Sequence, residues 1–294
     1  MACSRKPLIF DDSDGQELRI NTVNTYLKKK FGMKMVKLSI DGGFTCPNRD
    51  GTKGVGGCLF CSASGSGDTA AGSGDIIADL DSQITLLSDK WPSAGYIAYF
   101  QSHTNTYAPV TELREKFCAA LEHPSVKGIA IATRPDCLPD DVVDLLAELN
   151  KKTFMWVELG LQTIHAETAA KMNLCYTLDD YDLAVKKLIS RGIPVVTHLI
   201  LGLPGETREM MLDSVKHVCS RGIFGIKLHM FNLVKGSPME KLYPDYVSFD
   251  SIEEYTDLVI SALELIPPQV TVHRISGDAP RSTLISPAWS YKKR

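Results

Sequence analysis

Short apolar runs and longer amphipathic stretches alternate along most of the chain. Runs that are apolar nearly throughout, such as VVTHLILGL at 195–203, are typical of parallel strands covered on both faces. In the stretches between them, apolar residues recur every three or four positions, which predicts helices. The pattern predicts about seven strands, at 35–40, 96–100, 128–132, 154–161, 194–201, 223–231 and 270–275.

Helices are predicted between these strands and before the first one. Alternating strands and helices with right-handed crossovers give either a barrel or an open doubly wound sheet. A complete eight-unit barrel usually needs about 250 residues, and about 60 here belong to the N-terminal segment and a glycine-rich loop, so six units fit better. With no linker-like stretch, one domain is expected over 1–294. The predicted helices cover 17–31, 75–90, 111–122, 139–149, 178–191, 207–221 and 252–265.

Composition limits the kinds of partner. The chain has 294 residues, 44% of them hydrophobic, and a formal net charge of -3, which argues against wholesale electrostatic coating of nucleic acid but allows a local basic patch. No run approaches the roughly 18 apolar residues that would span a bilayer. The first residues also lack the apolar core of a secretory signal. A cytoplasmic protein with no membrane partner is therefore expected.

Three of the eight cysteines form a cluster. Eleven residues separate Cys46 from Cys58, and two separate Cys58 from Cys61, directly after the first predicted strand. Loops at the carboxyl ends of parallel strands commonly carry the chemistry of such folds. Cys118 and Cys219 lie instead in helix-like apolar stretches, where a small buried hydrophobe is the commoner explanation.

Spacing alone leaves three interpretations of the cysteine cluster open. A closed zinc site needs four ligands, and no second C-x2-C occurs in the chain, although His103 or another cysteine could complete the set. Inert thiols are the second alternative. A 4Fe-4S cluster held by three cysteines leaves one iron free for a small ligand. The spacing and the location favour the iron-sulfur cluster.

Four further motifs follow the cysteine loop: IATRPDCL at 131–138, VELGLQT at 157–163, HLILGLPGET at 198–207 and SGDAPR at 276–281. In this order they resemble the YhcC-like group of radical S-adenosylmethionine (SAM) proteins. Its core is similar to the radical SAM domain of the Elongator catalytic subunit and to oxygen-independent coproporphyrinogen oxidase. The resemblance implies an α/β fold, a partial (β/α)6 TIM-like barrel. It would be one radical SAM domain, with a core over about 21–275, an N-terminal helix and a C-terminal extension over 276–294.

The resemblance also implies two cofactors, a 4Fe-4S cluster and SAM. SAM would chelate the unique iron, and its reductive cleavage would give a 5'-deoxyadenosyl radical. The cluster would be bound by Cys46, Cys58 and Cys61, which makes them the catalytic and metal-binding set. Residues expected near SAM are Gln101, Ser102, Glu158, Gln162 and His198. Turn polarity, a structural carboxylate and a packed core histidine remain alternatives for members of this second set.

One position departs from the family pattern. Where relatives carry an arginine after the asparagine that follows Gln162, this chain has Leu174, after Asn173. Leucine cannot supply a charge-assisted hydrogen bond to an anionic group such as the SAM carboxylate. Arg134 or Lys171 could compensate; otherwise SAM binding is weakened. The hypothesis predicts that arginine at position 174 tightens SAM binding.

The group includes MnmL-type enzymes, which modify the wobble uridine of tRNA, so tRNA is the expected substrate. They convert its 5-carboxymethylaminomethyl group to 5-aminomethyl. An electron donor such as flavodoxin or ferredoxin is also expected. The alternative is a zinc- or cluster-bearing RNA-binding module without turnover. Basic residues that could contact phosphates are Lys28, Lys29, Lys30, Lys34, Lys37 and those at 292–294, whereas Arg274, Asp278 and Arg281 could face an anionic substrate group or form an internal ion-pair network.

Overall fold

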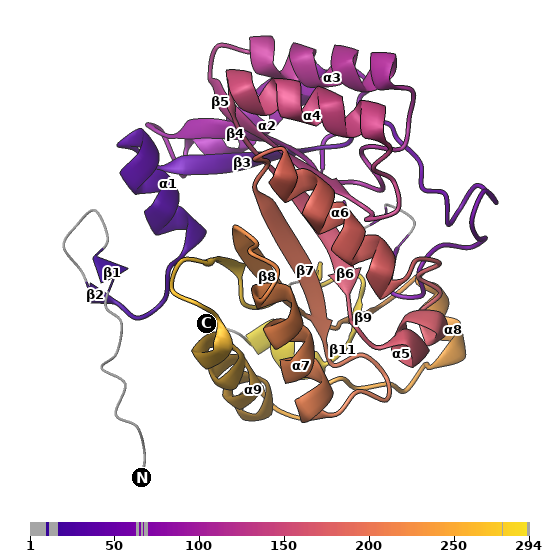
Figure 1. Ribbon diagram of the computed structural model, residues 1–294. Helices are drawn as coiled ribbons and strands as arrows, with labels where there is room; N and C mark the ends of the chain where they lie inside the picture. Colours follow the sequence, from indigo (N-terminus) through magenta and orange to yellow (C-terminus); the bar gives the residue numbers. More distant parts are fainter. Residues whose placement is uncertain are drawn as a thin grey trace.

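A curled parallel sheet forms the centre of the molecule (Figure 1). The computed structural model describes residues 10–11, 17–62, 65, 67, 70–277 and 279–292. In this part of the chain seven strands pair in parallel in the order β10-β8-β7-β6-β5-β4-β3, which confirms the predicted number. Their bounds are β3 (Met35–Ile40), β4 (Gly95–Phe100), β5 (Val126–Thr133), β6 (Phe154–Gln162), β7 (Val195–Leu201), β8 (Gly225–Met230) and β10 (Thr271–Arg274).

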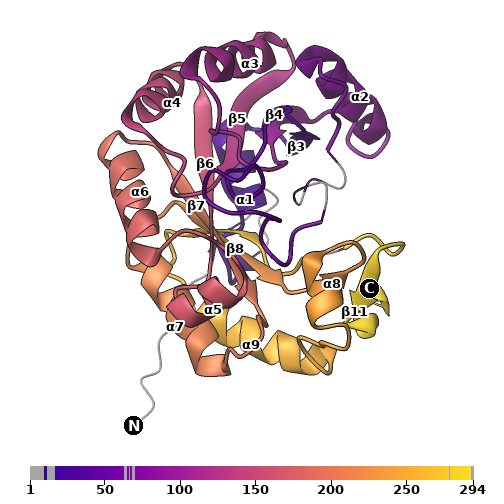
Figure 2. The same cartoon turned by 90° about the vertical axis from the view of Figure 1, so that its right-hand side faces the viewer.

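Helices cover the outer face of this sheet. Figure 2 shows them as an arc around the strands. Each strand of the parallel sheet from β3 to β8 is followed by a helix that returns the chain to the next strand of this sheet. The predicted partial barrel of six strand–helix units is therefore confirmed. No helix in the described ranges is long and apolar enough to cross a membrane. The outer helices are α2 (Ile76–Ser88), α3 (Val110–Glu122), α4 (Asp140–Lys152), α6 (Leu178–Ser190), α7 (Arg208–Cys219) and α9 (Ile252–Leu265).

The inner face of the sheet is closed at one end by α1 (Val23–Phe31). Its aromatic side chains pack at the start of β6 and before β8: the rings of Phe31 and Phe154 are 5.5 Å apart, and those of Tyr26 and Phe224 are 5.0 Å apart. Leu27 is 5% exposed in the same cluster. Because the N-terminal ends of the strands are plugged, the interior opens only toward their carboxyl ends.

The start of α1 differs from the sequence prediction, which began the helix at residue 17. Thr22 has an extended backbone, and its hydroxyl accepts a hydrogen bond from Thr25 N at 3.2 Å, so it caps a helix that begins at Val23. Glu17–Leu18 (β2) pairs instead with Phe10–Asp11 (β1). Sequence periodicity does not distinguish a capped helix from one that begins earlier.

Several short elements complete the fold. After β8 the chain forms β9 (Leu233–Val234) and α8 (Pro238–Leu242). β11 (Leu284–Ser286) pairs antiparallel with β9, so the predicted C-terminal extension is attached beside the end of β8. α5 (Ala166–Lys171) precedes α6, and a 3-10 helix spans Ala288–Lys292. Such short segments lack the periodicity needed to predict them. The single domain remains a prediction.

We expect Leu27→Ala to lower the free energy of unfolding by about 2–5 kcal/mol, because it leaves a cavity in the plug. Leu86→Ala is the matched control: Leu86 also lies in a helix, α2, but is 71% exposed, so its loss should stay within about 0.5 kcal/mol. Denaturant titration measures both. Equal losses of unfolding free energy in the two variants would contradict the inference that α1 packs into and closes the inner face of the sheet.

Candidate active site

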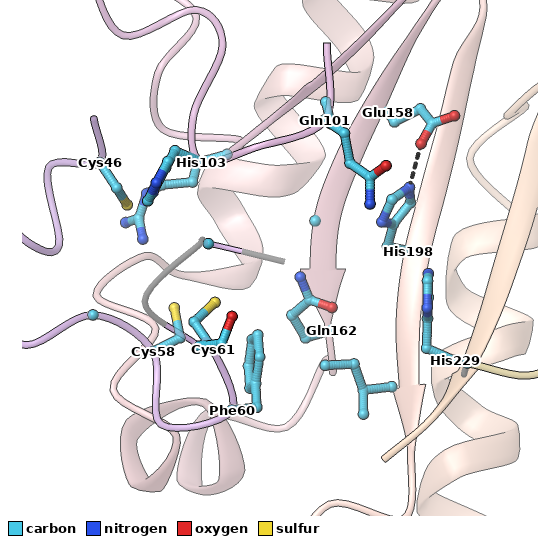
Figure 3. Close-up of a pocket in the computed structure, with 18 of the residues that line it drawn as sticks. Cys46, Cys58, Phe60, Cys61, Gln101, His103, Glu158, Gln162, His198 and His229 are labelled. Carbon is cyan, nitrogen blue, oxygen red and sulfur yellow. Dashed lines mark hydrogen bonds and ion pairs between the residues drawn. The ribbon is translucent and has the colours of Figure 1, made fainter. Parts of the chain in front are cut away.

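A cavity of about 650 Å³ lies inside the open end of the partial barrel (Figure 3). One wall is the cysteine loop, residues 41–74, which connects β3 to α2. The other walls are residues at or near the carboxyl ends of the central strands. Cys46, Cys58, Cys61, Gln101, Glu158, Gln162 and His198 all line it, so seven of the eight predicted site residues meet in one place.

The three cysteines lie on one side of this cavity as partly buried thiols that form no disulfide. In Figure 3 Cys58 and Cys61 lie next to each other, and Cys46 lies apart from them on the same side of the view. A hydrogen bond with Cys61, and then burial, raise the pKa of Cys58 well above its ordinary value. Asn48 Nδ2 also donates to Cys58 Sγ at 3.5 Å.

This arrangement fits an iron-sulfur cluster. Among the described residues, no group of three or more His, Cys, Asp or Glu side chains is gathered closely enough to hold a metal ion. A single zinc ion needs its ligands to converge on one point. In a 4Fe-4S cluster each thiolate binds a different iron, so three thiols that line one cavity without converging on a single point are suitable ligands.

The segment 172–176, called the strap below, fastens the cysteine loop to the barrel. Leu59 N donates to Met172 O at 3.0 Å, and Asn173 Nδ2 donates to Gly57 O at 2.8 Å. Asn173 and Cys175 have φ angles of 54° and 56°, a left-handed conformation that costs energy in non-glycine residues. The strap therefore fixes the part of the cysteine loop next to Cys58 and Cys61.

Arg134, which directly follows β5, holds the strap in place by a hydrogen bond. Its guanidinium forms a two-point contact with Asp136, at 2.9 and 3.0 Å, and donates to Leu174 O at 2.9 Å. Burial would lower the pKa of Arg134. The hydrogen bonds and the negative charge of Asp136 have the larger effect and hold this pKa above its ordinary value. Asp136 also pairs with Lys53 of the cysteine loop at 3.2 Å. Arg134 is thus a positioning residue whose hydrogen bonds are largely used within the protein.

Leu174 has a structural role that the sequence did not show. Its side chain is 1% exposed and belongs to an apolar cluster with Leu203, Phe231 and Met239, and it does not line the cavity. Lys171 does not line the cavity either, because it pairs with Glu167 on α5 at 2.7 Å. An arginine at position 174 would enter the apolar cluster, so the hypothesis that it tightens SAM binding is not supported by this geometry.

Gln101 and Gln162 reach the cavity, whereas Ser102 does not. Gln162 has φ 71°, and a Cβ on Gly160 would lie 2.6 Å from its Nε2, so a larger residue at position 160 would displace the amide from this place. Figure 3 shows the Gln101 amide directed toward the His198 ring. Ser102 is only 1% exposed, and Gly67 packs against it: a Cβ added to Gly67 would meet the Ser102 Oγ. Its proposed SAM contact stays a prediction without geometric support.

Glu158 is a fully buried acceptor in the middle of the barrel. Tyr99 OH donates to its Oε2 at 2.7 Å, and Trp156 Nε1 donates to Oε1 at 2.8 Å. Lys227 contacts Oε2 directly, and Lys37 lies 3.6 Å from Oε1. Burial would raise the pKa of Glu158, but the two lysines and His198 outweigh it and keep the pKa well below its ordinary value. An ionised carboxylate with so many donors acts mainly by orienting its neighbours.

His198 is one of these neighbours. Its Nε2 lies 2.8 Å from Glu158 Oε2, and burial, with the charge of Lys227, lowers its pKa to about 4. The ring is therefore neutral at neutral pH, and the ionised carboxylate requires the proton on Nε2. Nδ1 is left as a hydrogen-bond acceptor, which suits a hydroxyl or amino group of a ligand.

Sequence analysis missed Lys227, Tyr99 and His229. Lys227 and His229 interrupt an otherwise apolar strand, β8, as His198 interrupts β7, and that interruption was the available signal. The rings of His198 and His229 lie 5.1 Å apart. Tyr99 gave no signal, because aromatic residues are common in buried strands.

Leu174→Arg is expected to cost about 2 kcal/mol or more of stability, because it places a charge in the apolar cluster. Leu174→Met, which conserves volume, should cost less than about 1.5 kcal/mol. Denaturant unfolding of both variants measures these two losses of stability. Tighter SAM binding by Leu174→Arg at unchanged stability, measured by calorimetry, would restore the earlier hypothesis.

The lowered pKa of His198 predicts a pH-dependent stability. The unfolded chain takes up a proton below about pH 6.5 but the folded chain only near the folded pKa of about 4, so stability is lost as the pH falls through this window. Between pH 7 and 5, wild type should lose up to about 2 kcal/mol more than His198→Gln. Parallel denaturant titrations at the two pH values measure this difference. Identical losses would show that His198 is not held neutral.

Comparisons with known proteins agree with this geometry. Residues 46–218 match the model of the radical SAM superfamily, and residues 223–294 match that of the Radical_SAM C-terminal domain. YtqA of Bacillus subtilis is 50% identical over 94% of this chain and 87% of its own length. YhcC of Escherichia coli is 39% identical over 92% and 87%. A tRNA uridine(34) acetyltransferase of Methanocaldococcus jannaschii is 26% identical over 59% of this chain and 32% of its own length.

Solved structures show the same fold at low sequence identity. Elp3 of Methanocaldococcus infernus has a TM-score of 0.63 with 17% identity, covering 85% of this chain and 58% of that one. Methylornithine synthase (PylB) has a TM-score of 0.58 with 16% identity, covering 85% and 67%. Enzymes of this superfamily use a 4Fe-4S cluster and SAM. The matched model, the half-barrel fold and the YhcC similarity together show that the chain is a radical SAM enzyme of the YhcC-like group.

Proposed function

We propose that this enzyme holds a 4Fe-4S cluster on Cys46, Cys58 and Cys61 and converts the 5-carboxymethylaminomethyl group of wobble uridine in tRNA to 5-aminomethyl. The observation that carries the proposal is the set of three thiols, none of them in a disulfide, that line one cavity at the open end of a partial barrel. When bound, the cluster and SAM supply a 5'-deoxyadenosyl radical that abstracts hydrogen. The apolar cluster around α1 closes the other end of the barrel, so solvent would reach such a radical only from the open end, which a bound substrate would cover.

Three polar side chains are suited to bind SAM. Gln101, Gln162 and His198 all line the cavity, and the first two offer amides that both donate and accept. Glu158 acts through His198, because its carboxylate fixes the proton on Nε2 and leaves Nδ1 as the acceptor. The left-handed backbone at Gln162 is the kind of local strain found at ligand-binding positions.

The tRNA substrate is supported by relatives and constrained by the structure. A similar sequence is named for its action on tRNA uridine 34. The predicted basic stretch does not form one RNA-binding face: Lys37 points inward to Glu158, and Lys30 and Lys34 pack over the rings of Phe154 and Trp91. Residues 293–294 of the basic C-terminus lie outside the described residues. The uridine is therefore expected to enter through the open end of the barrel, away from α1.

The proposed reaction balances without a further oxidant. The methylene between nitrogen and carboxylate loses one hydrogen atom and one electron, which together cleave SAM to methionine and 5'-deoxyadenosine. The resulting carbon–nitrogen double bond takes up water and breaks, leaving the 5-aminomethyl amine and releasing glyoxylate. The electron that starts the first cleavage of SAM comes from a donor such as flavodoxin or ferredoxin. The electron that the substrate loses replaces it at the end of each cycle.

The protein reconstituted with iron and sulfide without oxygen should bind about four irons per chain and, once reduced, convert the modified tRNA. Mass spectrometry of nucleosides should show 5-aminomethyluridine together with 5'-deoxyadenosine and glyoxylate. Serine at Cys46, Cys58 or Cys61 should reduce product below detection, because each thiolate binds an iron. Cys118→Ala, on the outer helix α3, should retain iron and product.

Two results would contradict the proposal. A colourless protein with one zinc per chain would identify a binding module without turnover. A brown protein that releases 5'-deoxyadenosine but leaves every wobble uridine unchanged would show a radical SAM enzyme with another substrate.

A further inference from the structure

The end of the cavity away from the cysteines carries a surplus of positive charge. Glu158 contacts Lys227, and Lys37 lies 3.6 Å from the other oxygen of the same carboxylate. Among the described residues Arg274 is left as a cation of the cavity wall without a carboxylate partner, and Asp278, the other candidate for an ion pair there, lies outside the described residues. Among the described residues that line the cavity, Glu158 is the sole carboxylate. A negative group bound at this end would therefore be stabilised by charges already in place.

Arg274 is the cation best placed to contact a ligand. It ends β10 in register with Lys227 of β8 and lines the cavity. No carboxylate of the described residues pairs with it, unlike Arg134, which is held by Asp136. Burial, His198 and then Arg274 lower the pKa of His229 well below its ordinary value, so the field of this guanidinium reaches the cavity wall.

His229 provides a second polar atom at the same place. Its Nε2 is buried and has no hydrogen-bond partner in the described ranges. A Cβ on Gly277 would lie 3.6 Å from His229 Nδ1 and 3.4 Å from Asn232 Nδ2, so the C-terminal extension passes next to His229 at this end. Unpaired buried polar atoms are costly, and a bound ligand is a common reason to retain one.

We propose that Arg274, assisted by His229, binds the carboxylate of the carboxymethylaminomethyl group, an inference that rests on the proposed function. SAM carries the other candidate carboxylate, but that group is expected at the free iron beside the cysteines. Figure 3 shows His198 and His229 across the cavity from the three cysteines. The reaction releases the carboxylate as glyoxylate, so the product loses its contact with Arg274. The same contact thus selects the substrate and favours release of the product.

The test measures affinity rather than turnover. Anticodon stem-loops carrying either 5-carboxymethylaminomethyluridine or 5-aminomethyluridine are titrated onto the cluster-loaded protein with SAM and without reductant. Wild type should bind the carboxylate form tighter by about tenfold or more, the range of a hydrogen bond to a charged group. Arg274→Gln should abolish this preference, and Arg274→Lys, which keeps the charge, should retain part of it. Arg114→Gln, on the outer helix α3 and paired with Glu148, is the matched control and should keep the full preference.

The outcomes separate this inference from the proposed function. If Arg274→Gln keeps the full preference, the carboxylate site is wrong, whether or not wild type makes 5-aminomethyluridine. If Arg274→Gln weakens SAM binding and leaves the preference intact, the guanidinium binds the SAM carboxylate and the inference is also wrong. If wild type shows an Arg274-dependent preference but yields no product with reductant, the anion site stands and the proposed reaction fails.

Discussion

The buried carboxylate of Glu158 decides how the interior of this barrel is arranged. Within the described residues it accepts contacts from side chains of β3, β4, β7 and β8 as well as from Trp156 on its own strand. A buried charge is tolerated only when it is paired and hydrogen-bonded, so these strands must keep their mutual positions. Their carboxyl ends form the cavity, and its shape therefore depends on this one group.

The open end of the barrel is built in a different way. The described residues of the cysteine loop form no helix or strand, and the strap holds the loop through backbone and side-chain hydrogen bonds. Arg134 joins the strap to Asp136, which also pairs with Lys53 of the loop. The loop is thus held by the strap and by the pair of Lys53 with Asp136, and its three thiols line the cavity.

Much of the fold could be predicted from the sequence because the strands are buried on both faces. Their runs are mostly apolar, with few polar interruptions, and β3 matches its predicted bounds of 35–40. The cysteine cluster was predicted from local spacing alone. The interior network was not predictable in this way, since Tyr99 and Lys227 lie 59 and 69 residues from Glu158. The same reason explains Leu174: family comparison suggested a lost ligand contact, whereas only the fold shows an apolar cluster behind the strap.

The central claim is that three cysteines hold the cluster and leave one iron open to SAM. Mössbauer spectroscopy of the protein reconstituted with iron-57 tests it most directly, because the irons are observed individually. The account predicts that adding SAM changes the isomer shift of one iron of the four and leaves the other three as they were. A spectrum in which SAM changes no iron, or in which all four irons are equivalent and fully ligated by the protein, would contradict it.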